Sequence, residues 1–181
     1  MWPLIGFVLL GRATGRNAFG SLVHAVVTSA IALQYVPLVI DADVAGAATP
    51  WAFFSAQFTM CYMLYDLWYI RHASYYLHHA LAIGASAYVL YTRRFANLVL
   101  LINVNEVSSI FFALTYLKVY PMVTRPLFVV SFVTCRIVWL AWVIRFKFID
   151  DLLLRTILNV HYAMNAYWLL HILHRCRART S

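Results

Sequence analysis

The stretch CYMLYDLWYIRHASYYLHHALAIGAS, residues 61–86, sets a few ionisable side chains into long apolar and aromatic runs. It holds one carboxylate, Asp66, and an adjacent imidazole pair, His78 and His79. A polar interruption after residue 70 is very short, so the pattern predicts a hairpin of two helices. Ionisable side chains are costly inside a bilayer and mark functional sites there by default. We therefore interpret the rest of the chain as the bundle that surrounds this hairpin.

The composition is that of an integral membrane protein. Of the 181 residues, 64% are hydrophobic and only 11% are charged, and the mean hydropathy is +0.77. A soluble domain is nearer half apolar and a quarter charged. There is no regular alternation of polar and apolar residues, which predicts helices rather than a β-barrel. The net charge of +8 gathers at helix ends and connectors, which indicates topology and anionic-lipid contact and not nucleic-acid binding.

The apolar runs predict an all-α fold, a polytopic bundle of about six transmembrane helices around a central polar cavity. The expected helices are residues 18–40, 51–70, 73–91, 95–117, 127–146 and 152–173. A short apolar segment, residues 1–16, precedes this membrane domain of residues 17–175, and a basic tail, residues 176–181, follows it. Pro121 and Pro126 predict a break before the fifth helix. Basic residues are more numerous on the side that carries both termini, which predicts cytosolic termini.

Ionisable and amide side chains from separate helices are expected to meet at one level of the bundle. A helix rises ~1.5 Å per residue, so Asp66 and the histidine pair lie at similar depth on antiparallel neighbours. The candidate catalytic residues are Asp66, His78 and His79, as an imidazole base and its orienting carboxylate. The candidate lipid-binding residues are His24, Glu106, Arg136, His161 and Asn165.

Structural interpretations of the same residues stay open. Adjacent histidines on a helix point about 100° apart, so one of the pair can serve only to bond a neighbouring helix. Glu106 and Arg136 can form a buried ion pair that holds the bundle together. A diiron site needs several histidine boxes, and the chain has a single His-His pair, so we expect no metal site.

Five segments share a polar or charged residue set in apolar sequence. They are RNAFGSLVHA (16–25), YDLWYI with LHHALA (65–70 and 77–82), NEVSSIFFAL (105–114), FVVSFVTCRI (128–137) and MNAYWLL (164–170). In this order and spacing they resemble the TLC-domain family of multi-pass membrane proteins, which includes the ceramide synthases. The resemblance implies a bundle of six or more helices in the endoplasmic reticulum or a related membrane.

The same resemblance implies a chemistry. In the ceramide-synthase branch, paired histidines are implicated in transferring an acyl group from acyl-CoA to a long-chain amine. Carried over, this assigns that role to His78 and His79, with acyl-CoA as co-substrate, membrane lipids as partners and no other cofactor. The next helix reads INVNEVSS (102–109) where the synthases have a His-Asp and a further aspartate, a pattern closer to the non-synthase members. Two hypotheses follow: lipid acyl transfer, and a non-catalytic lipid-binding protein that senses or regulates membrane composition.

Overall fold

The computed structural model describes residues 17–41, 43–44, 49–70, 72–147 and 149–177. Within these ranges every regular element is helical, as predicted, and none is a strand. The predicted apolar segment 1–16 and residues 178–181 of the predicted tail lie outside the described residues.

The helices of the described part form six consecutive segments, two of which are composed of more than one element. The elements are α2 (Asn17–Val39), α3 (Pro50–Asp66), α4 (Ala73–Thr92), α5 (Ala96–Asn103), α6 (Glu106–Tyr116), α7 (Pro121–Ser131), the π-helix η1 (Phe132–Trp139), α8 (Leu140–Phe146) and α9 (Leu152–Arg177). The fourth segment is α5 with α6, and the fifth is α7, η1 and α8 in direct succession.

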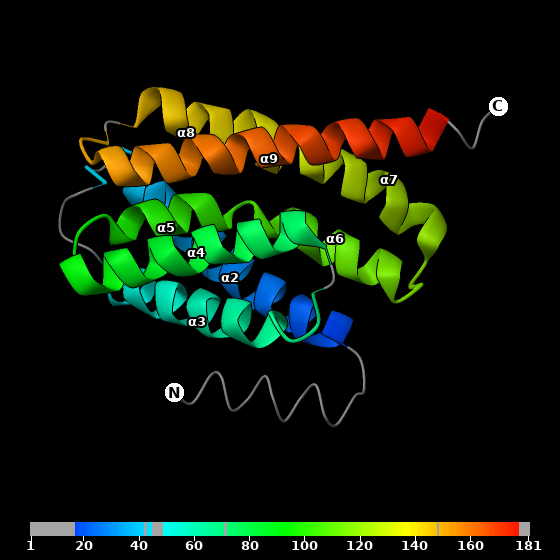
Figure 1. Ribbon diagram of the computed structural model, residues 1–181, viewed down its shortest axis with the longest axis horizontal. Coiled ribbons are helices and arrows are strands. Elements are labelled where there is room, and N and C mark those ends of the chain that lie inside the picture. Colours follow the sequence, from blue (N-terminus) through cyan, green and yellow to red (C-terminus); the bar gives the residue numbers. More distant parts are fainter. Residues whose placement is uncertain (1–16, 42, 45–48, 71, 148, 178–181) are drawn as a thin grey trace.

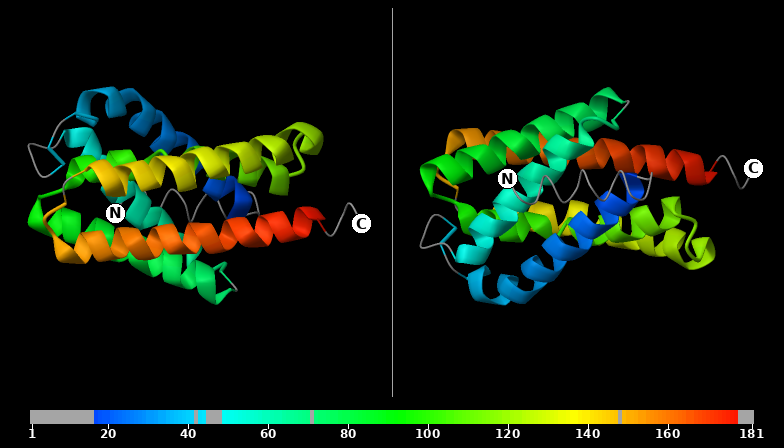
Figure 2. Two further views of the ribbon diagram at one scale, coloured as in Figure 1. Left: turned by 90° about the horizontal axis from the view of Figure 1, so that it is seen from above. Right: turned by 90° about the horizontal axis from the view of Figure 1, so that it is seen from below.

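The segments run back and forth along the long axis of an elongated bundle (Figure 1). The segment α7–η1–α8 and α9 lie along one edge, α2 and α3 lie along the opposite edge, and α4, α5 and α6 lie between them. Helix α2 packs against α3, α5 and α6, while α4 contacts both α3 and α9. Figure 2 shows that α7 and α9 separate toward the C-terminal end of α9. Within the fifth segment, α9 contacts η1 and α8.

Two of the described helices are long and apolar enough to cross a membrane. They are Ala18–Val39 and Pro121–Phe146. A third candidate is the pair α5 and α6, which bends by 42° and counts as a span only if the two helices are taken together. By length and composition, the described part of the chain therefore has two or three candidate spans, which is consistent with a membrane protein.

The bundle buries polar side chains beside an apolar core, and it exposes many large apolar side chains on its surface. Buried polar side chains include His24, Asp66, His78, Arg136 and Asn165. Exposed side chains that are large and apolar include Leu38, Val130, Val138 and Leu170. Soluble proteins rarely expose large continuous apolar surfaces, so this distribution agrees with an environment of lipid.

The fourth segment breaks at Val104 and Asn105, where the sequence predicted one continuous helix. The backbone N–H of Asn105 donates to the carbonyl of Ile102 at 2.9 Å, three residues back in place of the helical four. The carbonyl of Leu101 thereby loses its helical partner. It accepts a 2.7 Å hydrogen bond from the indole Nε1 of Trp139 instead. A side chain from the π-helix therefore stabilises the break.

The turn before the fifth segment lies earlier than predicted. Helix α7 begins at Pro121 and contains Pro126. The reversal falls on residues 117–120, where Lys118 and Tyr120 have positive φ angles of 60° and 44°. Proline is favourable in the first turn of a helix because its missing N–H has no partner there in any case. Pro121 therefore starts the helix, and Pro126 lies inside it, so neither proline belongs to the break.

A polar clasp connects the end of α4 to the start of α9. The hydroxyl of Tyr88 donates to Asp151 Oδ2, and the backbone N–H of Leu154 donates to Asp151 Oδ1 at 2.9 Å. Asp151 is thus the N-cap of α9. These two hydrogen bonds, that of Tyr88 above all, hold the pKa of Asp151 below its ordinary value of 3.8. Beside the clasp, Arg94 and Asp150 form an exposed ion pair at 3.3 Å.

Candidate functional site

Asp66 and His79 form a direct contact between α3 and α4. His79 Nε2 lies 2.8 Å from Asp66 Oδ2, and both residues are buried. The sequence predicted that Asp66 would lie beside one imidazole of the pair, and this proximity is confirmed. On the other side of the ring, His79 Nδ1 lies 2.8 Å from the backbone carbonyl oxygen of Tyr75.

These two contacts engage both nitrogens of His79. A carbonyl oxygen only accepts, so Nδ1 carries a proton and donates it to Tyr75. One further proton lies between Nε2 and Asp66 Oδ2, held by the imidazolium or by the carboxylic acid. A general base needs a free lone pair directed at the proton that it removes, and His79 has none in this arrangement. The pair is therefore suited to holding α3 against α4.

His78 lies edge-on to the ring of His79 at 5.4 Å and packs against α9. Its ring stacks on that of His161, with centroids 5.0 Å apart and planes inclined by 26°, and it meets Trp168 edge-on at 5.4 Å. His78 Nδ1 and His161 Nε2 are both buried without a hydrogen-bond partner. The two residues are only 8% and 9% exposed. Because buried polar atoms are nearly always bonded, these nitrogens represent unused binding capacity.

A cavity of about 70 Å³ lies beside these two rings. Apolar side chains line part of it, and the polar residues of its wall are Thr59, His78, Ser86, Asn103, Asn105, Glu106 and His161. The volume accommodates a few water-sized groups, and it is less than half of the roughly 150 Å³ of a cavity that binds benzene. A space of this size suits the polar end of a ligand and not an acyl chain.

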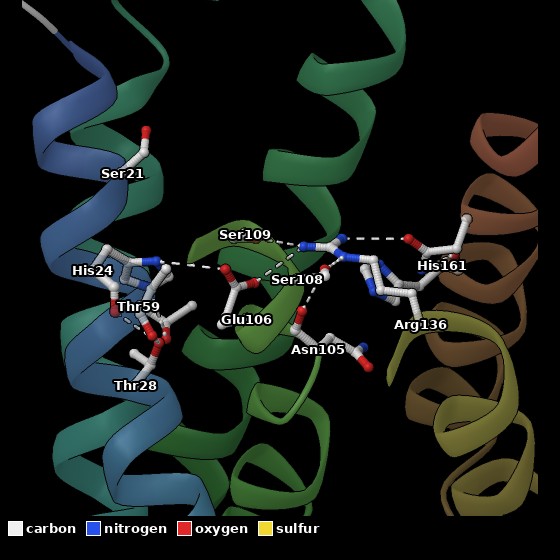
Figure 3. Close-up of polar contacts among 12 residues, drawn as sticks. Ser21, His24, Thr28, Thr59, Asn105, Glu106, Ser108, Ser109, Arg136 and His161 are labelled. Carbon is white, nitrogen blue, oxygen red and sulfur yellow. Dashed lines mark hydrogen bonds and ion pairs between the residues drawn. The ribbon is translucent and has the colours of Figure 1, made fainter. Parts of the chain in front are cut away.

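Asn105 has the largest unused hydrogen-bonding capacity in the cavity wall. It is 2% exposed, and neither its Oδ1 nor its Nδ2 has a partner. Asn103, two residues earlier, instead donates from Nδ2 to Ser55 Oγ at 2.7 Å. A side-chain amide offers both an acceptor and a donor, so Asn105 suits a ligand group that also does both. Figure 3 shows Asn105 in the close-up with Glu106 and Arg136.

Arg136, on the π-helix η1, is bonded through every guanidinium nitrogen. Nε donates to Ser108 Oγ at 2.7 Å, Nη2 donates to Ser109 Oγ at 2.7 Å, and Nη1 donates to Asn165 Oδ1 at 3.3 Å. Nη2 also lies 3.7 Å from Glu106 Oε1 (Figure 3). The structural interpretation of Arg136 and Glu106 as a buried ion pair therefore agrees with the geometry.

Glu106 extends this network to α2. Its Oε2 lies 3.9 Å from Nδ1 of His24 (Figure 3). On the other side of the ring, His24 Nε2 lies 3.4 Å from Thr59 Oγ1, and the imidazole stacks on Tyr62 at 4.1 Å. Charges inside a membrane are tolerated when they are compensated. Here the charges of Glu106 and Arg136 offset one another.

The eight predicted site residues occupy three places in the bundle. His78, Glu106 and His161 line the cavity; Asp66 and His79 form the α3–α4 pair; His24, Arg136 and Asn165 belong to the network around Glu106. Of the two histidines assigned to catalysis, only His78 therefore lines this cavity. In the part of the chain that the structure describes, no group of three His, Cys, Asp or Glu side chains is placed to hold a metal ion.

Six polar residues of the site were not among the predicted ones: Thr59, Ser86, Asn103, Asn105, Ser108 and Ser109. The last four lie in the segment NVNEVSS, residues 103–109. Five of its seven residues are polar although apolar sequence surrounds it, and that density was the available signal. The partners of each side chain depend on η1 and α9, which are distant in sequence.

No protein-family model matches the chain, and no curated protein or solved structure is similar to it. The function is accordingly argued from the geometry of the bundle and its cavity.

Proposed function

We propose that this chain is a polytopic membrane protein of lipid metabolism, with all six helical segments crossing the bilayer around the buried polar side chains. The apolar outer surface supports this proposal. Exposed aromatic side chains lie near both ends of the bundle, among them Trp68 and Tyr120 at one end and Tyr91 and Phe146 at the other. Aromatic residues are enriched at membrane interfaces. The resemblance to the TLC-domain family favours the endoplasmic reticulum as the location of the protein. The distribution of basic residues favours an orientation with both termini in the cytosol.

The proposed activity is acyl transfer from acyl-CoA to a lipid acceptor, with His78 as general base. One observation carries it: His78 lines the cavity and its Nδ1 is buried without a partner, whereas both nitrogens of the adjacent His79 are engaged. A histidine that only stabilised the bundle would be bonded as His79 is. The catalytic role that the sequence analysis assigned to both His78 and His79 is thereby proposed for His78 alone. His79 and Asp66 become positioning residues, since they fix the helix on which His78 lies.

The chemistry requires one proton to move to His78 and back. An acceptor O–H or N–H gives its proton to Nδ1 as the acceptor atom attacks the thioester carbonyl carbon. The carbon–sulfur bond then breaks, and the proton on Nδ1 passes to the leaving sulfur, which departs as the thiol of coenzyme A. No redox partner is needed, because a thioester is exchanged for an ester or an amide.

The test is turnover by the purified full-length chain with an acyl-CoA and a panel of lipid acceptors. Release of coenzyme A is measured. His78→Gln should lower the rate by about 10²- to 10⁴-fold, the usual contribution of a general base. His72→Gln, at the exposed start of α4, is the matched control and should leave the rate unchanged. A wild-type protein inactive on both hydroxyl and amine acceptors, or an undiminished His78→Gln rate, would contradict the proposal.

A second candidate is non-catalytic lipid binding by a sensor or regulator of membrane composition. The small cavity favours it, because about 70 Å³ holds a polar group but leaves no room for a thioester and an acyl chain together. In that case lipid should co-purify with the wild type and turnover should be absent. The lipid should also be retained by a folded His79→Gln variant, since His79 does not line the cavity. Turnover by the wild type would exclude this candidate.

A further inference from the structure

We propose that the cavity binds the hydroxyl group of an uncharged lipid and that Asn105 determines this preference. The inference rests on the proposed function and specifies its acceptor as an alcohol instead of an amine. It is carried by three properties of the cavity wall: its unpartnered atoms, its charge and its size.

The unpartnered atoms require a ligand that both donates and accepts hydrogen bonds. His78, His161 and Asn105 contribute them, and each of these side chains is at least nine-tenths buried. Nδ2 of Asn105 can only donate and its Oδ1 can only accept. A hydroxyl group has one proton to donate and two lone pairs to accept, so it can bond the amide and an imidazole nitrogen at once. An ester or a hydrocarbon cannot donate and would leave an acceptor without a partner.

The charges in and beside the cavity favour a neutral ligand. Among the residues that the structure describes, no lysine or arginine lines the cavity, and the one carboxylate in its wall, that of Glu106, is already beside Arg136. Arg136 in turn is committed to Ser108, Ser109 and Asn165. A phosphate or carboxylate would therefore find no free cation, and an ammonium group would find no free anion. Burying a charge without a partner is far more costly than burying a bonded hydroxyl.

The size of the cavity agrees with a small head group. A volume of about 70 Å³ fits a hydroxyl and the adjoining carbon atoms. Phosphocholine and similar zwitterionic head groups are much larger. The hydrocarbon chain of the ligand consequently lies outside this cavity.

The test compares three probes that share one hydrocarbon chain: oleyl alcohol, oleylamine and oleate. Thermal unfolding of the purified full-length protein in detergent is followed by tryptophan fluorescence with each probe. Oleyl alcohol at saturation should raise the unfolding midpoint by about 4 °C, because a ligand that binds only the folded state stabilises it. Oleylamine and oleate should produce less than half of that shift.

Two variants identify the residue responsible. Asn105→Leu, close in volume but without polar atoms, should abolish the shift caused by oleyl alcohol. Asn97→Leu replaces another buried asparagine of the same segment that does not line the cavity, and it should retain the shift.

The outcomes separate the inference from the proposed function. A larger shift with oleylamine or oleate would overturn the hydroxyl preference and leave lipid binding intact. No shift with any probe, together with no turnover, would overturn both. Retention of the alcohol shift in Asn105→Leu would overturn the role of Asn105. If that variant does not fold, the three probes on the wild-type protein still decide the preference.

Discussion

Two groups of buried polar residues lie in the same bundle and differ in how their hydrogen-bonding capacity is used. The first group, termed the partnered network, consists of Asp66, His79, His24, Glu106 and Arg136. The second, termed the unpartnered group, consists of three residues that line the cavity, His78, His161 and Asn105. Both groups are removed from water, but only the first recovers its lost hydrogen bonds within the protein.

The difference separates residues that hold helices together from residues available to a ligand. A buried polar group without a partner costs about 1–3 kcal/mol. Three such residues around one cavity are costly, and binding of a polar ligand would offset that cost. The partnered network carries no such penalty, and removing one of its members creates one. The two groups should therefore respond to substitution in opposite ways.

The largest effect is expected at the centre of the partnered network. Arg136→Met leaves Glu106 as a buried charge without its cation, which should destabilise the protein by about 3–5 kcal/mol. Arg125→Met, at an exposed position of the same segment, should change stability by no more than about 0.5 kcal/mol. Chemical unfolding in detergent measures both. Equal stability of the two variants would show that the network does not hold the bundle.

The adjacent histidines provide the most direct test of the comparison. His79→Phe keeps the ring but removes both hydrogen bonds, which should cost roughly 1.5–3 kcal/mol because one partner is a carboxylate. His78→Phe keeps the ring contacts with His161 and Trp168 and removes an unpartnered nitrogen, so stability should be unchanged or slightly raised. Unfolding midpoints of the two variants, measured side by side, check this. The reverse order would contradict the division into two groups.

The hydrogen bonds of Asp151 test whether the loss of stability expected for the partnered network depends on burial. Asp151 is hydrogen-bonded like the partnered network, but it caps α9 in a connecting segment. Asp151→Ala should destabilise by about 1 kcal/mol, as expected for loss of an N-cap. Asp150→Ala removes only an exposed ion pair and should cost less than about 0.5 kcal/mol. A cost for Asp151→Ala as large as that for Arg136→Met would mean that burial is not the deciding factor.

The smallest expected effect is a pH dependence of the contribution that Asp151 makes to stability. The pKa of Asp151 is lowered in the folded state by the bonds from Tyr88 and Leu154. Its contribution is therefore present above the ordinary value of 3.8 and is lost as the pH falls through the lower folded value. The stability difference between wild type and Asp151→Ala should shrink when unfolding is repeated at decreasing pH below that value. A difference that grows on acidification would contradict the assignment.

Much of the fold and part of the site were predictable. The six helical segments follow from apolar runs separated by short polar breaks, and the contact between Asp66 and a histidine follows from their spacing around a tight turn. The break at Val104 was not predictable in the same way. Ile102 and Val104 simply continue the apolar run, and the compensating bond comes from Trp139, 38 residues beyond Leu101.

The sequence by itself determined the class of protein, the order of the helices and the presence of ionisable groups among them. These are properties of composition and of neighbours along the chain, so they need no knowledge of packing. Only the tertiary structure decided that His79 is bonded through both nitrogens while His78 retains an unpartnered nitrogen. Adjacent residues on a helix point about 100° apart, so they face different helices, and the partners found there depend on how segments distant in sequence are rotated and packed.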